Sequence, residues 1–421
     1  MRNKLTTFLA HHPATAYVIA YSGGLDSHAL LHACAALRAE HVLHLRAIHI
    51  DHGLQSVSTQ WAAHCRRVCD DLAIPFTSVS LHLQIPAGES VEAVAREARY
   101  AVFCEHLQAG EMLLTAHHQD DQAETLLLHL LRGSGVDGLA AMPAVRVLGQ
   151  GRLGRPLLSM TRAELSTYAQ SHALHFITDP SNTDTRFDRN YLRQQVMPLL
   201  TARWTSASKT LTRAAQWQAE SRGLLEQLVQ EKLPSFHGSH TQTLSVHTLL
   251  QTDIALQKAV LREWVTQLGF AKPPAQQLQQ LLSSVLLAKP DAAPCVRWQG
   301  CEVRRYRDDL YAFSPLMPLN TAQVWEWSDL DQPLYLEALQ KTLQPELLQA
   351  WRSLCQGQSV TVRLRQGGES VYLPHRGGKH SLKALLQERG IPPWERERLP
   401  LVYVGERLLG IPDVIWIEPT T

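Results

Sequence analysis

The sequence predicts an α/β fold, in which an N-terminal domain built on a parallel sheet is followed by a mainly helical middle domain and a small α+β C-terminal domain. Three observations support this prediction. Short apolar runs alternate with helical patterns in the first half of the chain, and long helical patterns fill the next part. Strand-like runs around one short helical pattern make up the last part. Alternation of strands and helices is typical of a parallel sheet.

The N-terminal half contains the clearest alternation. Its expected strands are 16–21, 45–50, 76–83 and 111–117, and helical patterns follow at 59–71, 90–107 and 119–131. In such folds ligands bind at the carboxyl ends of the parallel strands. We therefore expect the functional residues just after these strands.

The rest of the chain does not show this alternation of strand and helix patterns. A long helical pattern at 209–233 and two more near 252–268 and 274–288 precede two strands about a Gln-Gly turn at 295–315. Beyond residue 345, the pattern predicts a hairpin at 359–373, a short helix at 380–390 and two final strands. The expected domains are 1–205, 206–330 with its terminal β-hairpin, and 345–421.

Composition limits the possible classes. A chain of 421 residues with 45% hydrophobic residues, 19% charged residues and a net charge of +1 is typical of a soluble protein of several domains. Any nucleic-acid-binding surface must therefore be local. Neither a secretory leader nor an apolar run of ~18 residues is found, so we expect a cytoplasmic chain without a membrane partner. The seven cysteines show no C-x-x-C pair, which argues against a disulfide framework or a zinc site.

The segment S-G-G-L-D-S at 22–27 lies where the first strand passes into a helix. Glycines let the backbone approach an anion, and a helix N-terminus offers free N–H groups with partial positive charge. Ser22 and Ser27 can donate hydrogen bonds, and Asp26 is placed to hold Mg²⁺ that bridges phosphates. Gly-Gly alone would more often be a tight connection, but the whole pattern favours a polyphosphate site.

Two other glycine motifs do not predict nucleotide binding. The segment R-G-G-K-H-S at 376–381 lacks the Ser or Thr and the earlier glycine of a Walker loop. The segment G-S-G-V-D-G at 133–138 follows a helical pattern, whereas a dinucleotide fingerprint follows a strand. We interpret it as a glycine loop that ends a helix.

The run Ser22, Gly23, Gly24, Leu25, Asp26 and Ser27 resembles the signature of the PP-loop (N-type) ATP pyrophosphatase superfamily. The resemblance implies a Rossmann-like, adenine nucleotide alpha hydrolase-like domain that cleaves ATP between the α and β phosphates and adenylates an oxygen of a substrate. Five later segments and the chain's last part are similar in order and spacing to the tRNA(Ile)-lysidine synthetase family: 50–54, 92–100, 115–142, 155–165, 178–198 and 377–411.

This resemblance implies a ligase that uses ATP, Mg²⁺ and L-lysine to modify tRNA(Ile) with the anticodon CAU. ATP adenylates the C2 oxygen of the wobble cytidine, and pyrophosphate leaves. The ε-amine of lysine then displaces AMP and gives lysidine. Lysidine pairs with A instead of G, so the tRNA changes identity from methionine to isoleucine.

The resemblance also assigns roles to residues beyond the loop. Asp51 and His52 follow the second strand, where the superfamily holds adenosine and metal; a capping Asp and an idle His are the alternatives. Arg99 would contact the ATP phosphates or the reacting centre, although a solvated salt-bridged helix face is the plain reading of its segment. His117 and His118 lack a third spaced metal ligand and are expected to serve in packing and hydrogen bonding, with His117 near the nucleotide.

Three carboxylates at the start of the helix after residue 118 are the expected lysine-binding or catalytic groups: Asp120, Asp121 and Glu124. Residues three and four apart share a helix face, so these side chains are neighbours. Their charge would hold the ammonium groups of lysine, and one would accept the proton that the nucleophile loses. The alternative is that they complement the helix dipole.

Two segments are expected to bind tRNA. The first interleaves cations with aromatic residues, a pattern suited to an anticodon loop, and its expected contacts are Arg186, Arg189, Asn190 and Arg193. The second, 361–400, holds eight Lys or Arg against four Glu, a local net charge of +4. Its expected contacts with the acceptor arm are Lys379, Lys383 and Arg389.

Two other functions remain open at this stage. One is a PP-loop tRNA thiolase, for which Cys65 and Cys69 would be the relevant cysteines. The other is an ATP-binding protein that senses tRNA without catalysis. The sequence also leaves open the oligomeric state, with a homodimer as one option, the identity of the proton acceptor, and whether the middle domain contacts tRNA.

Overall fold

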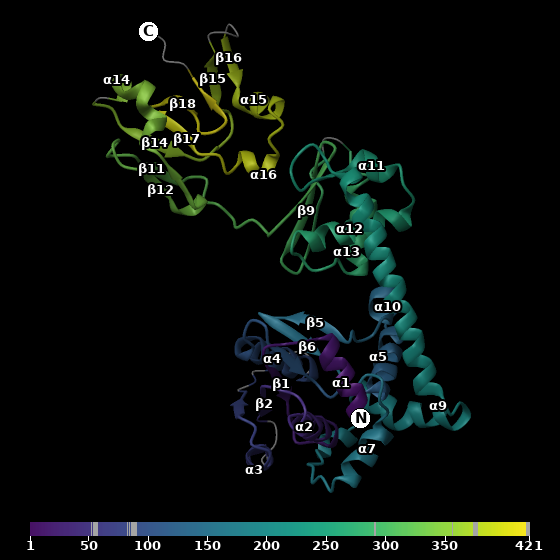
Figure 1. The fold of residues 1–421 in the computed structure, drawn as a ribbon. Coiled ribbons are helices and arrows are strands. Elements are labelled where there is room, and N and C mark those ends of the chain that lie inside the picture. Colours follow the sequence, from purple (N-terminus) through teal and green to yellow (C-terminus); the bar gives the residue numbers. More distant parts are fainter. Residues whose placement is uncertain are drawn as a thin grey trace. The chain divides into compact units, whose positions relative to one another are not determined.

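The computed structural model describes residues 1–421 except 52, 54–57, 82, 84, 86–90, 290–291, 356, 374–377 and 418–421. The chain divides into two compact units, Met1–Leu228 and Val229–Thr421, which are described separately (Figure 1). Among the described residues, no helix is long and apolar enough to cross a membrane.

A six-stranded sheet forms the centre of the first unit, in the order β3-β2-β1-β4-β6-β5. The strands are β1 (Tyr17–Ala20), β2 (Leu45–Asp51), β3 (Phe76–Ser80), β4 (Met112–Leu114), β5 (Val145–Leu148) and β6 (Gly151–Gly154). All neighbours are parallel except β5, which runs antiparallel to β6. The prediction of a parallel sheet is confirmed, and the two last strands are additions to it.

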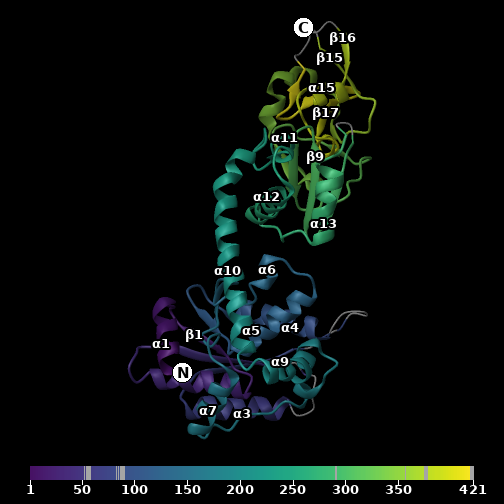
Figure 2. The ribbon, with the colours of Figure 1, turned by 90° about the vertical axis from the view of Figure 1, so that its right-hand side faces the viewer.

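Alternation along the strands sends side chains into two separate cores. On β1, Tyr17 and Ile19 belong to the core that also contains residues of α1, α2, α3 and α7, whereas Val18 faces the core beneath α4. In Figure 2, α1 and α4 lie on opposite sides of β1. A sheet covered on both faces explains why its strands read as continuous apolar runs.

The helices of this unit follow the strands in the predicted alternation. They are α1 (Arg2–His11), α2 (Leu25–Leu37), α3 (Ser58–Asp71), α4 (Val91–His106), α5 (Gln119–Leu131), α6 (Val136–Leu139), α7 (Arg162–Ser171), α8 (Asp188–Tyr191) and α9 (Met197–Arg203), with a π-helical turn at Leu192–Val196. The long α10 (Ala207–Lys232) crosses the boundary between the two units.

Strand β6 escaped sequence prediction because it begins and ends with glycine. A Cβ at Gly151 would lie 2.6 Å from the carbonyl oxygen of Glu111, so only glycine lets this strand approach its neighbour so closely. Glycines within a strand weaken the local pattern that indicates one. The tertiary contact, and not local propensity, therefore selects this strand.

The second unit begins with a helical region that also carries a small antiparallel sheet. Helices α11 (Val246–Leu250), α12 (Ile254–Gln267) and α13 (Ala275–Gln280) pack on strands β7 (Leu244–Ser245), β8 (Cys295–Trp298), β9 (Cys301–Tyr306) and β10 (Asp309–Phe313). The predicted pair about Gln-Gly is β8 and β9. A third strand, β10, follows a turn in which Arg307 has a φ of 55°, and it was not predicted.

A separate core underlies the last part of the chain. Its five-stranded sheet has the order β11-β14-β17-β18-β19, and its strands are β11 (Val324–Glu326), β14 (Val360–Arg363), β17 (Leu401–Val404), β18 (Arg407–Ile411) and β19 (Ile415–Trp416). The strands β15 (Ser370–Leu373) and β16 (Gly378–Ser381) form a hairpin before α15 (Leu382–Glu388). This unit contains two distinct cores, and the predicted division into middle and C-terminal domains stays a prediction.

The predicted hairpin at 359–373 is wrong. Strand β14 pairs with β11 and β17, and β15 pairs with β16. Gly367 and Gly368 both have positive φ, at 97° and 83°, and turn the chain away between the two segments. Val360 and Val362 are buried because β14 lies between β11 and β17 in the sheet. The local sequence pattern does not indicate which strands pair with β14.

Helix α2 buries a histidine in its first turns. His28 is 5% exposed and packs edge-on against Tyr21, with ring centroids 5.7 Å apart. Burial, together with the neighbouring His64 and His32, lowers the pKa of His28 to about 4. The ring is therefore held neutral inside the fold at neutral pH.

We expect the first unit to lose stability as the pH falls from about 6.5 to about 4, because the unfolded chain binds the proton of His28 more readily than the folded chain. At and above pH 6.5 the full stability is present, and below pH 4 this group contributes no further loss. Urea unfolding across this range should show a smaller slope in His28→Gln. Leu31→Val, which lowers stability without removing a titrating group, should keep the wild-type slope; equal slopes in wild type and His28→Gln would contradict this assignment.

Candidate active site

The segment Ser22–Gly24 connects β1 to α2 through a compact turn. Gly23 has a φ of +82°, and a Cβ there would lie 2.6 Å from Cδ1 of Ile177. The N–H of Ile177 donates to the carbonyl of Gly23 at 2.9 Å, which fixes the turn from the other side. Leu25 begins α2 and packs on the core. The first N–H groups of α2 have no acceptor within the helix.

Ser22 and Ser27, the two serines of this segment, are hydrogen-bonded to each other. The Oγ atoms of Ser22 and Ser27 lie 2.9 Å apart, and Ser27 donates its hydroxyl hydrogen to the carbonyl of Gly24 at 3.0 Å. The backbone N–H of Ser22 donates to Oγ of Ser27 at 3.2 Å. Their hydroxyls therefore fix the shape of the turn, and their expected contacts with phosphate stay a prediction.

Asp26 lies in the first turn of α2 and faces the start of α5. Its Oδ1 is buried and has no hydrogen-bond partner among the described residues. Burial raises the pKa of Asp26, Asp121 raises it further, and His118, whose Nε2 is 3.8 Å from Oδ2, opposes this shift. A buried carboxylate oxygen without a partner fits a hard cation such as Mg²⁺. The described residues contain no cluster of three or more metal-ligating side chains, so such an ion would take its other ligands from phosphates and water.

Asp121 and Glu124 are buried on α5 and form an ion-pair cluster with two arginines. Arg189 donates to Oδ1 of Asp121 at 2.9 Å and to Oε2 of Glu124 at 3.0 Å. Arg193, in the π-helical turn, donates to Oε1 of Glu124 at 2.7 Å and to Oδ1 of Asp121 at 3.0 Å. These four side chains, the carboxylate–arginine cluster, balance two negative charges with two positive charges.

The charge state of this cluster follows from its neighbours. Burial alone would raise the pKa of Asp121, but His118 and Arg189 outweigh it and lower the value to about 2. The carboxylate thus stays ionised across the physiological range. Arg189 and Arg193 were expected to bind tRNA, and here their guanidinium groups point inward to α5.

Asp120 has a different environment. Its Oδ2 accepts from the N–H of Arg162 at the start of α7, at 2.9 Å, and its Oδ1 accepts from the hydroxyl of Ser208 on α10 at 2.9 Å. Asp120 thus joins three helices of the first unit. Both oxygens serve in structure, so the expected role in lysine binding rests more firmly on Asp121 and Glu124.

Two histidines lie between the loop and the cluster. His118 is buried, caps α5 and lies 3.5 Å through Nε2 from Oδ2 of Asp121. His117 contacts the hydroxyl of Thr115 through Nδ1 at 2.8 Å, and burial lowers the pKa of His117 to about 3. His117 is therefore a neutral hydrogen-bonding group at this edge.

The structure describes two of the three remaining residues that are expected to contact ATP. Asp51 ends β2, and its Oδ1 accepts from the N–H of Gly53 at 2.8 Å. His52 lies outside the described residues. The guanidinium of Arg99 lies 5.8 Å from the ring centroid of Tyr100 and is among the groups that lower the pKa of His117. Arg99 therefore lies near the same edge as His117.

The other expected tRNA contacts vary in exposure. Arg186 is exposed and pairs with Asp184 at 2.7 Å, and Asn190 donates to the carbonyl of Asp184 at 2.9 Å. In the second unit, Lys379 on β16 and Lys383 on α15 are exposed. Arg389 is exposed and donates to the carbonyl of Val414. The roles of these residues stay predictions.

Sequence reasoning missed residues that only the fold brings to this edge. Arg155 follows β6, and Arg146 lies on β5, beside Tyr100 of α4. Their segments carry no local signal beyond an arginine near a short strand.

Cys65 and Cys69, the cysteines relevant to a thiolase, are fully buried, and burial raises the pKa of both thiols to about 12.

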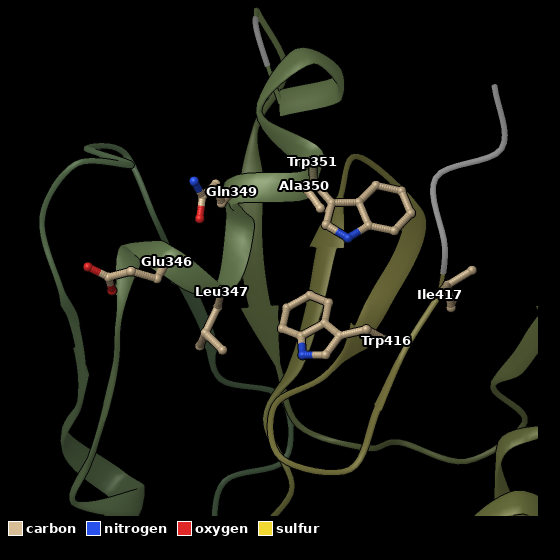
Figure 3. Close-up of a pocket in the computed structure, with 7 residues that line it drawn as sticks. All are labelled: Glu346, Leu347, Gln349, Ala350, Trp351, Trp416 and Ile417. Atoms are coloured by element: carbon tan, nitrogen blue, oxygen red, sulfur yellow. The ribbon is translucent and has the colours of Figure 1, made fainter.

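A pocket of about 570 Å³ lies elsewhere, in the second unit (Figure 3). Its lining residues are Glu346, Leu347, Gln349, Ala350, Trp351, Trp416 and Ile417. None of the expected site residues lines it. The chemistry-bearing residues of the first unit gather instead at the carboxyl edge of the six-stranded sheet.

Family models match three parts of the chain. A PP-loop domain model matches residues 1–200, a TilS substrate binding domain model matches residues 244–311, and a TilS substrate C-terminal domain model matches residues 360–419. The phosphate loop and the carboxylate–arginine cluster both lie within the first of these matches.

Relatives match along nearly the full chain. The tRNA(Ile)-lysidine synthase of Coxiella burnetii is 43% identical, over 94% of this chain and 88% of the relative. That of Alkalilimnicola ehrlichii is 42% identical over 96% and 90%, and that of Methylococcus capsulatus is 38% identical over 99% and 96%. The match includes the regions that distinguish this family from other PP-loop enzymes, and the chain therefore belongs to the tRNA(Ile)-lysidine synthase family.

Proposed function

We propose that this ATP-dependent ligase joins L-lysine to C2 of the wobble cytidine in the CAU anticodon of tRNA(Ile), through an adenylated cytidine. One observation supports this proposal most directly. His118 lies 3.8 Å from Asp26 of the phosphate loop and 3.5 Å from Asp121 of the carboxylate–arginine cluster. A nucleotide at the loop and an amino acid at the cluster would thus be neighbours, as two successive steps on one base require.

The loop suits the adenylation step. The N–H groups at the start of α2 and the partial positive charge of that helix favour phosphate binding, and the positive φ of Gly23 allows the tight turn that precedes them. Asp26 would hold Mg²⁺, which neutralises the charge that develops as pyrophosphate leaves. The neutral His117 can donate or accept a hydrogen bond without adding charge.

The carboxylate–arginine cluster suits an amino acid. A zwitterion carries an ammonium group and a carboxylate, and the cluster offers both opposite charges within hydrogen-bond distance of each other. We infer that Asp121 and Glu124 bind an ammonium group of lysine, while Arg189 and Arg193 bind its α-carboxylate. Arg189 also favours the ionised form of Asp121, since it lowers the pKa of that carboxyl.

Incubation of the pure chain with ATP, labelled lysine and CAU tRNA(Ile) tests the proposed function. We expect the label in the wobble nucleoside and release of pyrophosphate that depends on the tRNA. Sulfur in place of lysine in the modified base would indicate a thiolase. ATP binding without any pyrophosphate release would indicate a sensor protein.

Because tRNA is the substrate, we place the activity in the cytoplasm. A homodimer stays a prediction.

Asp26→Asn and Ser27→Ala should each lower the rate of AMP formation by about 100-fold or more, because each removes an electrostatic or structural part of the phosphate site. AMP formation measured with saturating lysine and tRNA tests this. Asp70→Asn, which removes an exposed carboxylate from α3, is the matched control and should keep the wild-type rate. Wild-type AMP formation in the Asp26 variant would refute the assigned site.

Asp121→Asn and Glu124→Gln should raise the KM for lysine by about tenfold or more, since each removes a buried charge that pairs with an ammonium group. The KM for ATP should change far less. Glu111→Gln removes another buried carboxylate, which pairs with Arg46 at 2.5 Å at the opposite end of β4, and controls for loss of stability. Equal increases in both KM values would argue against a lysine pocket.

Lys379→Gln combined with Lys383→Gln should weaken tRNA binding and lower the slope of log K against log salt by roughly 0.7–0.9 per lost phosphate contact. ATP binding should not change. Lys341→Gln provides the control, because Lys341 already pairs with Asp413 at 2.7 Å. A salt slope that matches wild type would rule out contact between these two lysines and tRNA.

A further inference from the structure

Arginines surround Tyr100 on the first unit. The guanidinium carbons of Arg96 and Arg146 lie 5.1 Å from the centroid of its ring, and that of Arg99 lies 5.8 Å away. Arg155 interacts with the side chain of the same tyrosine. We call these five residues the Tyr100 cluster.

Topology places this cluster at the functional edge of the sheet. Gly154, the last residue of β6, pairs with Leu114, the last residue of β4, so Arg155 and Thr115 leave the sheet at the same edge. Arg146 pairs with Leu153 and lies at the same end of β5. Both Arg99 and Arg155 lower the pKa of His117, which places the cluster next to the candidate active site.

Arg155 forms the buried part of the cluster. It is 3% exposed, and its Nη1 donates to the carbonyl of Pro143 at 2.6 Å. Its Nε is buried without a hydrogen-bond partner among the described residues. A buried donor without a partner is costly, by about 1–3 kcal/mol in general, so the site is incomplete as it stands.

The cluster brings four arginine side chains together around one tyrosine. Among the described residues, no carboxylate forms an ion pair with Arg96, Arg146 or Arg155. The surrounding arginines lower the pKa of Tyr100 even though burial raises it. Burial and the neighbouring Arg146 lower the pKa of Arg155. The shift of Tyr100 has the sign that neighbouring positive charges produce, and an anion beside these arginines would be stabilised.

We propose that Arg96, Arg146 and Arg155, together with the Tyr100 hydroxyl, bind phosphodiester groups of the RNA strand next to the reacting nucleotide. This inference rests on the proposed function. The guanidinium fork matches phosphate oxygens, and Arg96 and Arg146 are exposed at the rim while Arg155 is buried behind them. An extended polyanion can contact the exposed Arg96 and Arg146 and the buried Arg155 at the same time. The phosphates of ATP already have their own donors after β1, two strands away from β6.

The test uses the full chain and a CAU anticodon stem-loop RNA, without lysine, so that binding is read apart from turnover. Arg96→Gln and Arg146→Gln change exposed side chains and should each weaken RNA binding by about threefold to tenfold and lower the salt slope by about 0.7–0.9. Arg146→Lys should recover part of the affinity, because it restores charge without the fork. Arg67→Gln, an exposed arginine of α3, should bind RNA as wild type does.

Two results would overturn the proposal. One is unchanged RNA affinity and salt slope in the double variant Arg96→Gln and Arg146→Gln. The other is a loss of affinity for ATP or inorganic pyrophosphate in that variant with RNA binding intact, which would assign the cluster to the nucleotide instead. Failure of the wild-type chain to incorporate labelled lysine would contradict the proposed function, while the RNA-binding result would still stand by itself.

Discussion

The burial of Asp121 and Glu124 on α5 is the constraint on which the site depends. Two neighbouring buried carboxylates repel each other and lose hydration, so their burial is costly unless opposite charges lie beside them. Arg189 and Arg193 supply those charges and so tie the segment 188–196 to α5. Removal of one partner from such a buried set costs about 3–5 kcal/mol in general. The same ion pairs that stabilise the helix contacts therefore also form the proposed amino acid site.

This arrangement works because a parallel sheet gathers the ends of its strands. The phosphate loop follows β1, His117 and His118 follow β4, and Arg155 follows β6. Each of these segments has a different proposed role: phosphate binding after β1, hydrogen bonding after β4, and contact with RNA phosphates after β6. Asp120 then joins α5 to α7 and α10 and holds these segments in place.

The carboxylate–arginine cluster and the Tyr100 cluster differ in the charges that they bring together. The carboxylate–arginine cluster is neutral as a whole, which suits a zwitterion. The Tyr100 cluster gathers several arginines around one tyrosine, which suits a polyanion. In the proposed assignment, the amino acid and the RNA therefore bind to different arginines.

The sequence alone determined the phosphate loop, the alternation that builds the parallel sheet, and the positions of Asp121 and Glu124 on one helix face, because these depend on local periodicity and short motifs. Tertiary structure decided the rest. Strand β6 exists because Gly151 and Gly154 allow close packing, β14 pairs with distant strands, and Arg189 and Arg193 turn inward because buried carboxylates need them. Arg146 and Arg155 meet Tyr100 only across the sheet. Long-range contacts of this kind leave no local pattern, since each partner alone looks like an ordinary surface arginine or a short loop.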